Sequence, residues 1–253
     1  MPVVAINNTS VHYQQLNETG KETVILIHGM FSNLAVYYFN IAPLLAQRYR
    51  VVMYDMKGHG MSSRVTAGYD LQAMADDLLA LMKALDITSA HLVGYSFGGL
   101  VALKMAMLYP QCIQKLGVIE GPDPADKEAL KVIETYSKDF LVHYVNTFTD
   151  NAIMKMGKRQ LEKNHRMYEF LFNETTIRAD MQAEHAFFTA GGVDAIGHTT
   201  LLLYGRQSNC VAAGEKLHQM IKHASMLLIE GDHNVPLQQP LVIGNALTAF
   251  FDN

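Results

Sequence analysis

The stretch His91-Leu92-Val93-Gly94-Tyr95-Ser96-Phe97-Gly98-Gly99 decides the fold, because it places a serine inside Gly-x-Ser-x-Gly between an apolar strand and an apolar helix. The turn is so sharp that a Cβ atom at Gly94 or Gly98 would collide with neighbouring backbone. We expect the turn to lift the Ser96 hydroxyl clear of the sheet and to aim the helix N-terminus at it. Backbone N–H groups and the helix dipole could then stabilise an oxyanion there.

Short apolar runs alternate with longer helical patterns along the chain, which predicts an α/β fold with a mostly parallel central sheet and helices on both faces. The expected strands are residues 11–15, 23–28, 49–55, 91–95, 115–120, 199–204 and 226–230. The expected helices are residues 37–46, 71–85, the helix after Ser96, and 240–251.

The interval between residues 120 and 199 is far longer than an ordinary strand-to-helix connection. A compact domain does not leave such a stretch without structure. Helical spacing in residues 129–140 and 158–172 predicts a cap over the C-terminal edge of the sheet, where open α/β folds bind ligands. We therefore divide the chain into an α/β core, residues 1–120 and 199–253, and an inserted helical cap, residues 121–198.

Composition narrows the class of protein. The chain has 253 residues, of which 49% are hydrophobic and 17% charged, and this argues against disorder. The formal net charge of −4 predicts neither nucleic acid nor an anionic membrane as partner. The start of the sequence does not resemble a signal peptide, and two cysteines do not make a disulfide scaffold. We expect a cytoplasmic protein, either a monomer or a homodimer.

Ser96 needs a base, because a serine hydroxyl is a poor nucleophile until its proton is removed. His233, in Gly231-Asp232-His233-Asn234 after the last expected strand, is the best candidate among eleven histidines. A His28-Gly29 turn after the strand at 23–28 should direct the N–H of Met30 toward the nucleophile. The N–H groups of Met30 and Phe97 would then form the oxyanion hole.

Four pieces of the sequence together resemble the α/β-hydrolase superfamily over essentially the whole chain. They are His28-Gly29-Met30, Asp55-x-x-Gly58-His59-Gly60-x-Ser62, Gly94-Tyr95-Ser96-Phe97-Gly98-Gly99 and Gly231-Asp232-His233. The resemblance implies the α/β-hydrolase fold and a triad in the chain order serine, acid, histidine. We expect His28, Asp55 and His59 to have structural roles.

The third member of the triad departs from the commoner family pattern. Most members carry an aspartate after the strand predicted at 199–204, whereas residues 205–211 contain no carboxylate. Glu120 lies at the end of the strand after Ser96, and small bacterial carboxylesterases that this chain resembles carry their acid at this point. We assign Glu120 as the orienting acid; Asp123 and a degenerate site positioned by Asn209 are the alternatives.

The resulting hypothesis is a serine hydrolase that cleaves an ester or thioester of a small, largely apolar acyl group, without a metal or organic cofactor. One alternative is a thioesterase for carrier-bound acyl or polyketide chains, with an acyl carrier protein as partner. Another is a ligand-binding receptor on the same fold with little turnover. The residues expected to contact substrate are aromatic or apolar side chains of the turns and the cap: Phe31, Tyr95, Phe140, Tyr144, Met154, Phe187 and Phe188.

Overall fold

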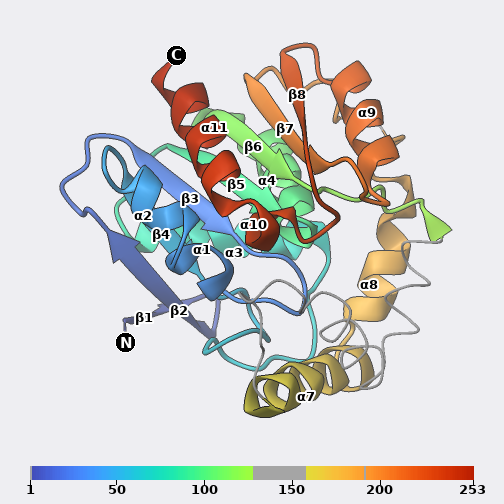
Figure 1. Cartoon of the computed structure of the whole chain (residues 1–253). Coiled ribbons are helices and arrows are strands. Elements are labelled where there is room, and N and C mark those ends of the chain that lie inside the picture. The colour runs from blue at the N-terminus through green and yellow to red at the C-terminus, as the bar shows by residue number, and fades with distance from the viewer. Residues whose placement is uncertain (1, 128–157, 191) are drawn as a thin grey trace.

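An eight-stranded sheet forms the centre of the computed structural model, which describes residues 2–127, 158–190 and 192–253 (Figure 1). The strand order is β1-β2-β4-β3-β5-β6-β7-β8. Two antiparallel strands at one edge are β1 (Val3–Ile6) and β2 (Thr9–Leu16). The other six pair in parallel: β3 (Thr23–Ile27), β4 (Arg50–Tyr54), β5 (Ala90–Tyr95), β6 (Ile113–Ile119), β7 (Thr200–Gly205) and β8 (Ala224–Ile229). The predicted, mostly parallel sheet is confirmed.

Helices cover both faces of the sheet, as predicted, and each face has its own apolar core (Figure 1). One core contains α3 (Leu71–Ala84), α4 (Phe97–Leu108) and α9 (Val211–Met220). The other contains α1 (Ala35–Tyr38), α2 (Ile41–Leu45), α10 (Val235–Gln238) and α11 (Pro240–Asp252). Every residue of β3 and β5 is buried, as expected for strands covered on both faces.

The prediction of a single helix at residues 37–46 is wrong, because the structure has two short helices there, α1 and α2. Asn40 breaks the helical path with φ −131° and ψ −73°. Pro43 lacks the N–H that a continuous helix would use at that point, but it is tolerated in the first turn of α2, where that N–H has no intrahelical acceptor. A short 3₁₀ turn, η1 (Pro110–Cys112), links α4 to β6.

The described part of the interval between β6 and β7 contains helices that lie to one side of the sheet (Figure 1). It contains α7 (Lys158–Glu174), α8 (Ile177–Ala183) and the turn η2 (Glu184–Ala186). The predicted helix at 158–172 matches α7, whereas the one at 129–140 lies outside the described residues. Carboxylates of Asp180 and Glu184 accept hydrogen bonds from the N–H groups of Tyr69 and Leu71, at 2.9 and 3.0 Å, and so attach this segment to the start of α3.

Among the described residues, no helix combines the length and the apolar character needed to cross a bilayer.

Candidate active site

Ser96 occupies a strained turn between β5 and α4. Its φ of 53° and ψ of −120° lie in a region that L-residues rarely adopt, at a cost on the order of 1–3 kcal/mol. The turn is held by the Ser96 N–H, which donates to the Ile119 carbonyl at 2.8 Å. A Cβ atom on Gly94 would lie 2.1 Å from the Gly98 carbonyl oxygen, so the glycines permit the turn to close. The predicted sharp strand-to-helix turn is therefore present.

His233 reaches Ser96 from the loop between β8 and α10. Its Nε2 lies 3.0 Å from Ser96 Oγ. The loop is ordered by Asp232, whose carboxylate accepts hydrogen bonds from the Asn234 N–H at 2.7 Å and from Gln238 Nε2 at 3.0 Å. It also approaches the end of β7 so closely that a Cβ atom on Gly205 would lie 2.4 Å from the Gly231 carbonyl oxygen. The closeness of these two loops sets the position of the imidazole.

Glu120 is fully buried at the end of β6 and meets the other ring nitrogen of His233. The distance between Glu120 Oε2 and His233 Nδ1 is 3.1 Å. The same carboxylate accepts hydrogen bonds from the Gly205 N–H and from the Ser208 hydroxyl. Because β6 pairs with both β5 and β7, its C-terminal end lies between the turns that carry Ser96 and Ser208. Ser96, His233 and Glu120 thus form one continuous chain of contacts.

The two alternative positions for the acid lie elsewhere. Asp123 forms an ion pair with Lys216 at 2.8 Å and accepts a hydrogen bond from the Ala125 N–H. Asn209 Oδ1 faces Cys210 Sγ at 3.6 Å. The carboxylate paired with His233 is that of Glu120.

The contacts of His233 make its imidazole a stronger base. Burial lowers the pKa of the imidazole, but hydrogen bonds to Cys210 and Glu120, together with the negative charge of Glu120, outweigh burial and raise that pKa above its usual value. The ring takes up a proton when it acts as a base toward a hydroxyl. A buried carboxylate beside Nδ1 stabilises the imidazolium that results.

The turn after β3 packs directly on Ser96. A Cβ atom on Gly29 would lie 3.1 Å from Ser96 Cβ, and one on Gly98 would lie 2.5 Å from the His28 carbonyl oxygen. Phe97 is the first residue of α4, so its N–H belongs to the helix-start donors that have no intrahelical acceptor. Met30 follows Gly29 in the same turn and is half-buried. Both proposed oxyanion donors therefore belong to segments that border Ser96.

His28 is tied into the backbone by both ring nitrogens. Nδ1 lies 2.7 Å from the Gly29 carbonyl oxygen, and Nε2 accepts the Met56 N–H at 3.0 Å. Burial is the main reason that the pKa of His28 is lowered. This ring is neutral and holds the turn, in line with the structural role expected for it.

Asp55 and His59 also serve the loop that follows β4. The Asp55 carboxylate accepts the N–H groups of Leu34 and Met61, each at 2.9 Å, and pairs with His12 at 2.8 Å. His59 Nδ1 lies 2.9 Å from the Lys57 carbonyl oxygen. Both side chains are structural, as expected.

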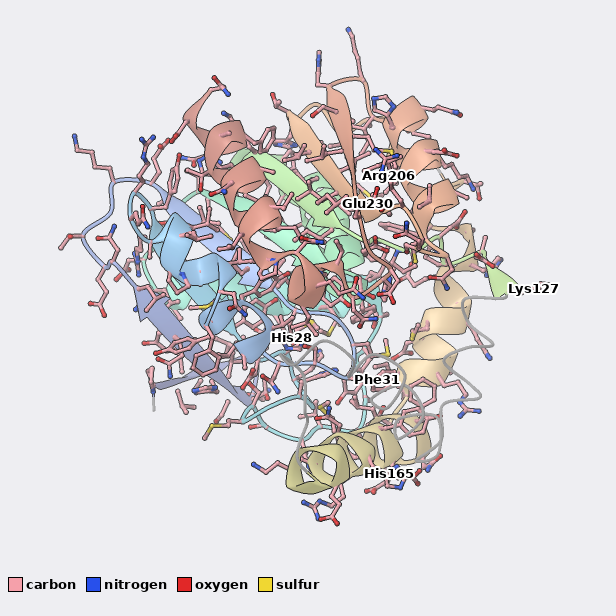
Figure 2. The ribbon with its side chains drawn as sticks, viewed as in Figure 1. His28, Phe31, Lys127, His165, Arg206 and Glu230 are labelled. Atoms are coloured by element: carbon pink, nitrogen blue, oxygen red, sulfur yellow. The ribbon has the colours of Figure 1, made fainter. Side chains whose placement is uncertain are left out.

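The predicted substrate-contacting residues have different environments. Phe31, which is labelled in Figure 2, follows Met30 in the chain. Its ring packs on Tyr168 and Phe172 of α7, with ring centroids 5.2 and 5.3 Å away. Phe187 and Phe188 are 4% and 1% exposed within the apolar core. Phe140, Tyr144 and Met154 lie outside the described residues.

Tyr95 supports the His233 loop. Its hydroxyl donates to the His233 carbonyl oxygen at 3.0 Å, and the two rings lie 5.5 Å apart. Sequence reasoning placed Tyr95 against substrate, and the structure gives its hydroxyl a partner in the loop that carries His233. The pairing joins residues 138 positions apart, so no local pattern could reveal it.

Three further residues at the site were not assigned a role from the sequence. Ser208 and the Gly205 N–H bind the Glu120 carboxylate. Cys210 Sγ lies 3.5 Å from His233 Nδ1. In the part of the chain that is described, Glu120, Cys210 and His233 are the one cluster whose donor atoms could share a metal ion, since these atoms lie within 4.8 Å of one another.

Comparison with known proteins agrees with this architecture. The family model described as "alpha/beta hydrolase fold" matches residues 22–141. A relative from Pseudomonas syringae named "Putative carbamate hydrolase RutD" is 28% identical over 246 residues, covering 90% of this chain and 93% of the relative. A protein of the same name from Pantoea ananatis is 42% identical over 101 residues, but this match spans only 36% of that relative's length and 40% of this chain.

A solved structure of a hydrolase from Pseudomonas aeruginosa superposes with a TM-score of 0.80 at 21% identity, covering 100% of this chain and 98% of the other. The fold is therefore shared along the full length. With the strand–serine–helix turn at Ser96 and the sheet order described above, these likenesses show that the chain has the α/β-hydrolase fold.

Proposed function

We propose that this protein is a serine hydrolase that cleaves an ester or thioester of a small, largely apolar acyl group through Ser96, His233 and Glu120. The observation that carries the proposal is the pair of contacts on the two nitrogens of one imidazole. His233 Nε2 lies 3.0 Å from Ser96 Oγ, and Nδ1 lies 3.1 Å from Glu120 Oε2. A base within hydrogen-bond reach of a hydroxyl, itself oriented by a third group, is the arrangement that activates serine.

The reaction proceeds in two halves. Ser96 Oγ attacks the acyl carbonyl carbon while His233 takes its proton, and the N–H groups of Met30 and Phe97 bind the oxyanion. His233 then protonates the leaving alcohol or thiol, and an acyl-Ser96 ester remains. In the second half, water gives its proton to His233 and attacks the acyl carbon. His233 then returns that proton to Ser96 Oγ as the acyl–oxygen bond breaks and the acid leaves. Glu120 keeps the proton of His233 on Nδ1, so that Nε2 is free to accept.

Apolar selectivity for the acyl group is supported by the aromatic cluster beside the turn at Met30. Phe31 packs with Tyr168 and Phe172, and the rings of Tyr168 and Phe172 stack at 4.8 Å. Apolar and aromatic side chains line most small-molecule sites. The position of this cluster next to the proposed oxyanion donors favours an acyl chain without charge.

A carbamate is a second candidate substrate class. It is favoured by the similarity, over 90% of this chain, to a relative whose name assigns it carbamate hydrolysis. A carbamate presents the same kind of carbonyl carbon to Ser96, so the same groups would act on it. The two classes differ in the leaving group and are separated by assay.

The test is hydrolysis of p-nitrophenyl esters of increasing acyl length, of an acyl thioester and of a p-nitrophenyl carbamate, with wild type and Ser96→Ala compared. Ser89→Ala is the matched control, because Ser89 precedes β5 and Ser96 follows it. We expect turnover in wild type and Ser89→Ala, and a loss of at least about 10³-fold in Ser96→Ala.

Labelling with a fluorophosphonate provides a readout that does not depend on the choice of substrate. A serine activated by a neighbouring base should take one label per chain, and Ser96→Ala should take none. Absence of both labelling and ester turnover in a folded wild-type protein would refute the proposed function and would favour a ligand receptor. Labelling without turnover of free esters would redirect the search to carrier-bound thioesters.

A further inference from the structure

The cluster of Glu120, Cys210 and His233 has a chemistry that the proposed hydrolytic mechanism does not use. Cys210 Sγ contacts the same ring nitrogen that faces Glu120, at 3.5 Å. Each of the three residues follows a different strand, β6, β7 or β8, at the same edge of the sheet. We propose that Glu120, Cys210 Sγ and His233 Nδ1 form a binding site for a thiophilic divalent cation such as Zn²⁺, and that occupancy switches off Ser96.

The separations between donor atoms fit a tetrahedral ion. With Zn–S near ~2.3 Å and Zn–N or Zn–O near ~2.0–2.1 Å, tetrahedral angles place sulfur about 3.6 Å from nitrogen, and nitrogen about 3.3 Å from oxygen. The structure has 3.5 Å between Cys210 Sγ and His233 Nδ1, and 3.1 Å between His233 Nδ1 and Glu120 Oε2. All three donors lie within 4.8 Å, so a movement of about one ångström by the Cys210 side chain closes the site.

The donor types select the ion. One thiolate, one imidazole and one carboxylate suit zinc and cadmium, whereas magnesium and calcium favour sites built mainly from oxygen ligands. A Glu120 carboxylate and a Cys210 thiolate together carry two negative charges, which balance the two positive charges of the ion. A buried charge is costly unless an opposite charge balances it. Glu120 is fully buried and Cys210 is 5% exposed, so the bound ion would provide that balance. The His233 side chain is 33% exposed and gives the ion a route of entry.

Binding at Nδ1 would remove the base from Ser96. In the hydrolytic mechanism, Nδ1 carries the proton and Nε2 holds the lone pair that accepts from Ser96. A metal needs the Nδ1 lone pair, so the proton moves to Nε2, and the Cys210 thiol releases one proton to solvent as it becomes a thiolate. The ring then donates a hydrogen bond toward Ser96 instead of accepting one. This inhibition depends on the proposed function, whereas the binding itself does not.

Metal binding is tested first, on freshly reduced and desalted protein titrated with Cd²⁺ in a buffer without chelator. A thiolate bound to Cd²⁺ gives an ultraviolet charge-transfer band that reports Cys210 directly. We expect one Cd²⁺ per chain in wild type and in Ser96→Ala, because Ser96 is not a ligand. Cys210→Ser should lose the band and bind more weakly by at least about tenfold.

Cys112→Ser is the matched control for the thiol. Cys112 directly precedes β6 and Glu120 directly follows it, so the length of a seven-residue strand, about 20 Å, separates this second cysteine from the site. The band should persist in Cys112→Ser. A band that is absent from wild type at one equivalent, or that survives in Cys210→Ser, would overturn the metal site.

Inhibition is tested second, on p-nitrophenyl ester hydrolysis, and each variant is compared with its own activity without metal. Zn²⁺ should inhibit wild type and Cys112→Ser, and the chelator EDTA should restore activity, while Mg²⁺ should have no effect. Cys210→Ser should resist Zn²⁺ by at least about tenfold in concentration. Metal binding that leaves Ser96-dependent hydrolysis unchanged would overturn the switch.

Failure of the proposed function gives a different pattern. In that case there is no Ser96-dependent hydrolysis with any ester, yet the Cd²⁺ band still decides whether the metal site exists. Persistence of the band in Ser96→Ala and its loss in Cys210→Ser would support the site on its own.

Discussion

Replacing Glu120 by glutamine should lower kcat by about 10⁴-fold while leaving the fold intact. Glu120 Oε1 accepts the Gly205 N–H, and Oε2 accepts from Ser208 and from His233 Nδ1. A glutamine can keep the Gly205 contact only by turning its NH₂ group toward His233. That donor stabilises the tautomer with a bare Nδ1 and a protonated Nε2, in which His233 cannot accept the proton of Ser96.

The opposite orientation of the amide is disfavoured. It restores an acceptor for His233 but directs the NH₂ group at the Gly205 N–H, which leaves a buried donor unsatisfied at a cost of about 1–3 kcal/mol. Loss of the charged partner in a serine protease triad, with the wrong tautomer that follows, lowers turnover by about 10⁴-fold. This corresponds to about 5.5 kcal/mol of transition-state stabilisation.

The assay is p-nitrophenyl ester hydrolysis with kcat and KM determined separately, alongside circular dichroism to verify folding. Asp123→Asn is the matched control, since this carboxylate pairs with Lys216 at 2.8 Å and not with His233. We expect Asp123→Asn to remain within about threefold of wild type, because this carboxylate pairs with Lys216 and does not contact His233. A folded Glu120→Gln variant with turnover within tenfold of wild type would refute the reasoning, and a large loss in Asp123→Asn would transfer the role to Asp123.

Three further predictions follow from buried contacts. Tyr95→Phe removes the hydrogen bond to the His233 carbonyl at 3.0 Å, which costs about 1 kcal/mol. It should therefore lower kcat about five- to tenfold and leave KM little changed. An unaltered kcat would contradict a role of Tyr95 in holding the His233 loop. Gly98→Ala should reduce the yield of folded protein and abolish fluorophosphonate labelling, because the added Cβ would lie 2.4 Å from the Ile27 carbonyl oxygen; normal labelling would argue against the tight turn. Burial and the charge of Lys115 lower the pKa of His91 to about 4 from 6.5, so between these pH values the unfolded chain binds a proton that the folded chain does not. The free energy of unfolding should therefore fall as pH drops from 6.5 toward 4. Urea unfolding at pH 4.5 and at pH 7 measures this loss, which should be smaller by about 2 kcal/mol in His91→Phe than in wild type. An equal loss in both proteins would contradict the lowered pKa of His91.

The strands of the sheet were predictable because a buried strand consists of a short run of apolar residues. The all-apolar run at residues 23–28 predicted a strand covered on both faces, and β3 is buried throughout. The helix after Ser96 was equally clear, because the glycines of the turn leave one backbone path from strand to helix. The short edge strand β1 was not predicted. Its partner lies in the next strand, and its exposed residues give no buried pattern.

The order of motifs along the chain identified the candidate site residues, and the structure then showed which of them are in contact. Ser96, His233 and Glu120 were each named from a motif or from a position at a strand end. Ser208, on Glu120, and Cys210, on His233, were not assigned a role, because no spacing rule relates them to partners 88 and 23 positions away. Tyr168 and Phe172 were seen only as part of a helix, since nothing local indicates that they pack on Phe31.

The sequence by itself determined the fold class, the strained turn at Ser96 and the likeness to α/β-hydrolases, because these depend on periodicity and backbone sterics within short segments. Only the tertiary structure shows which carboxylate faces His233. It also shows that Cys210 and Glu120 contact the same ring nitrogen of His233. The physical reason is the parallel sheet: it gathers the ends of β5, β6, β7 and β8 at one edge, and side chains far apart in the chain meet there within hydrogen-bond distance.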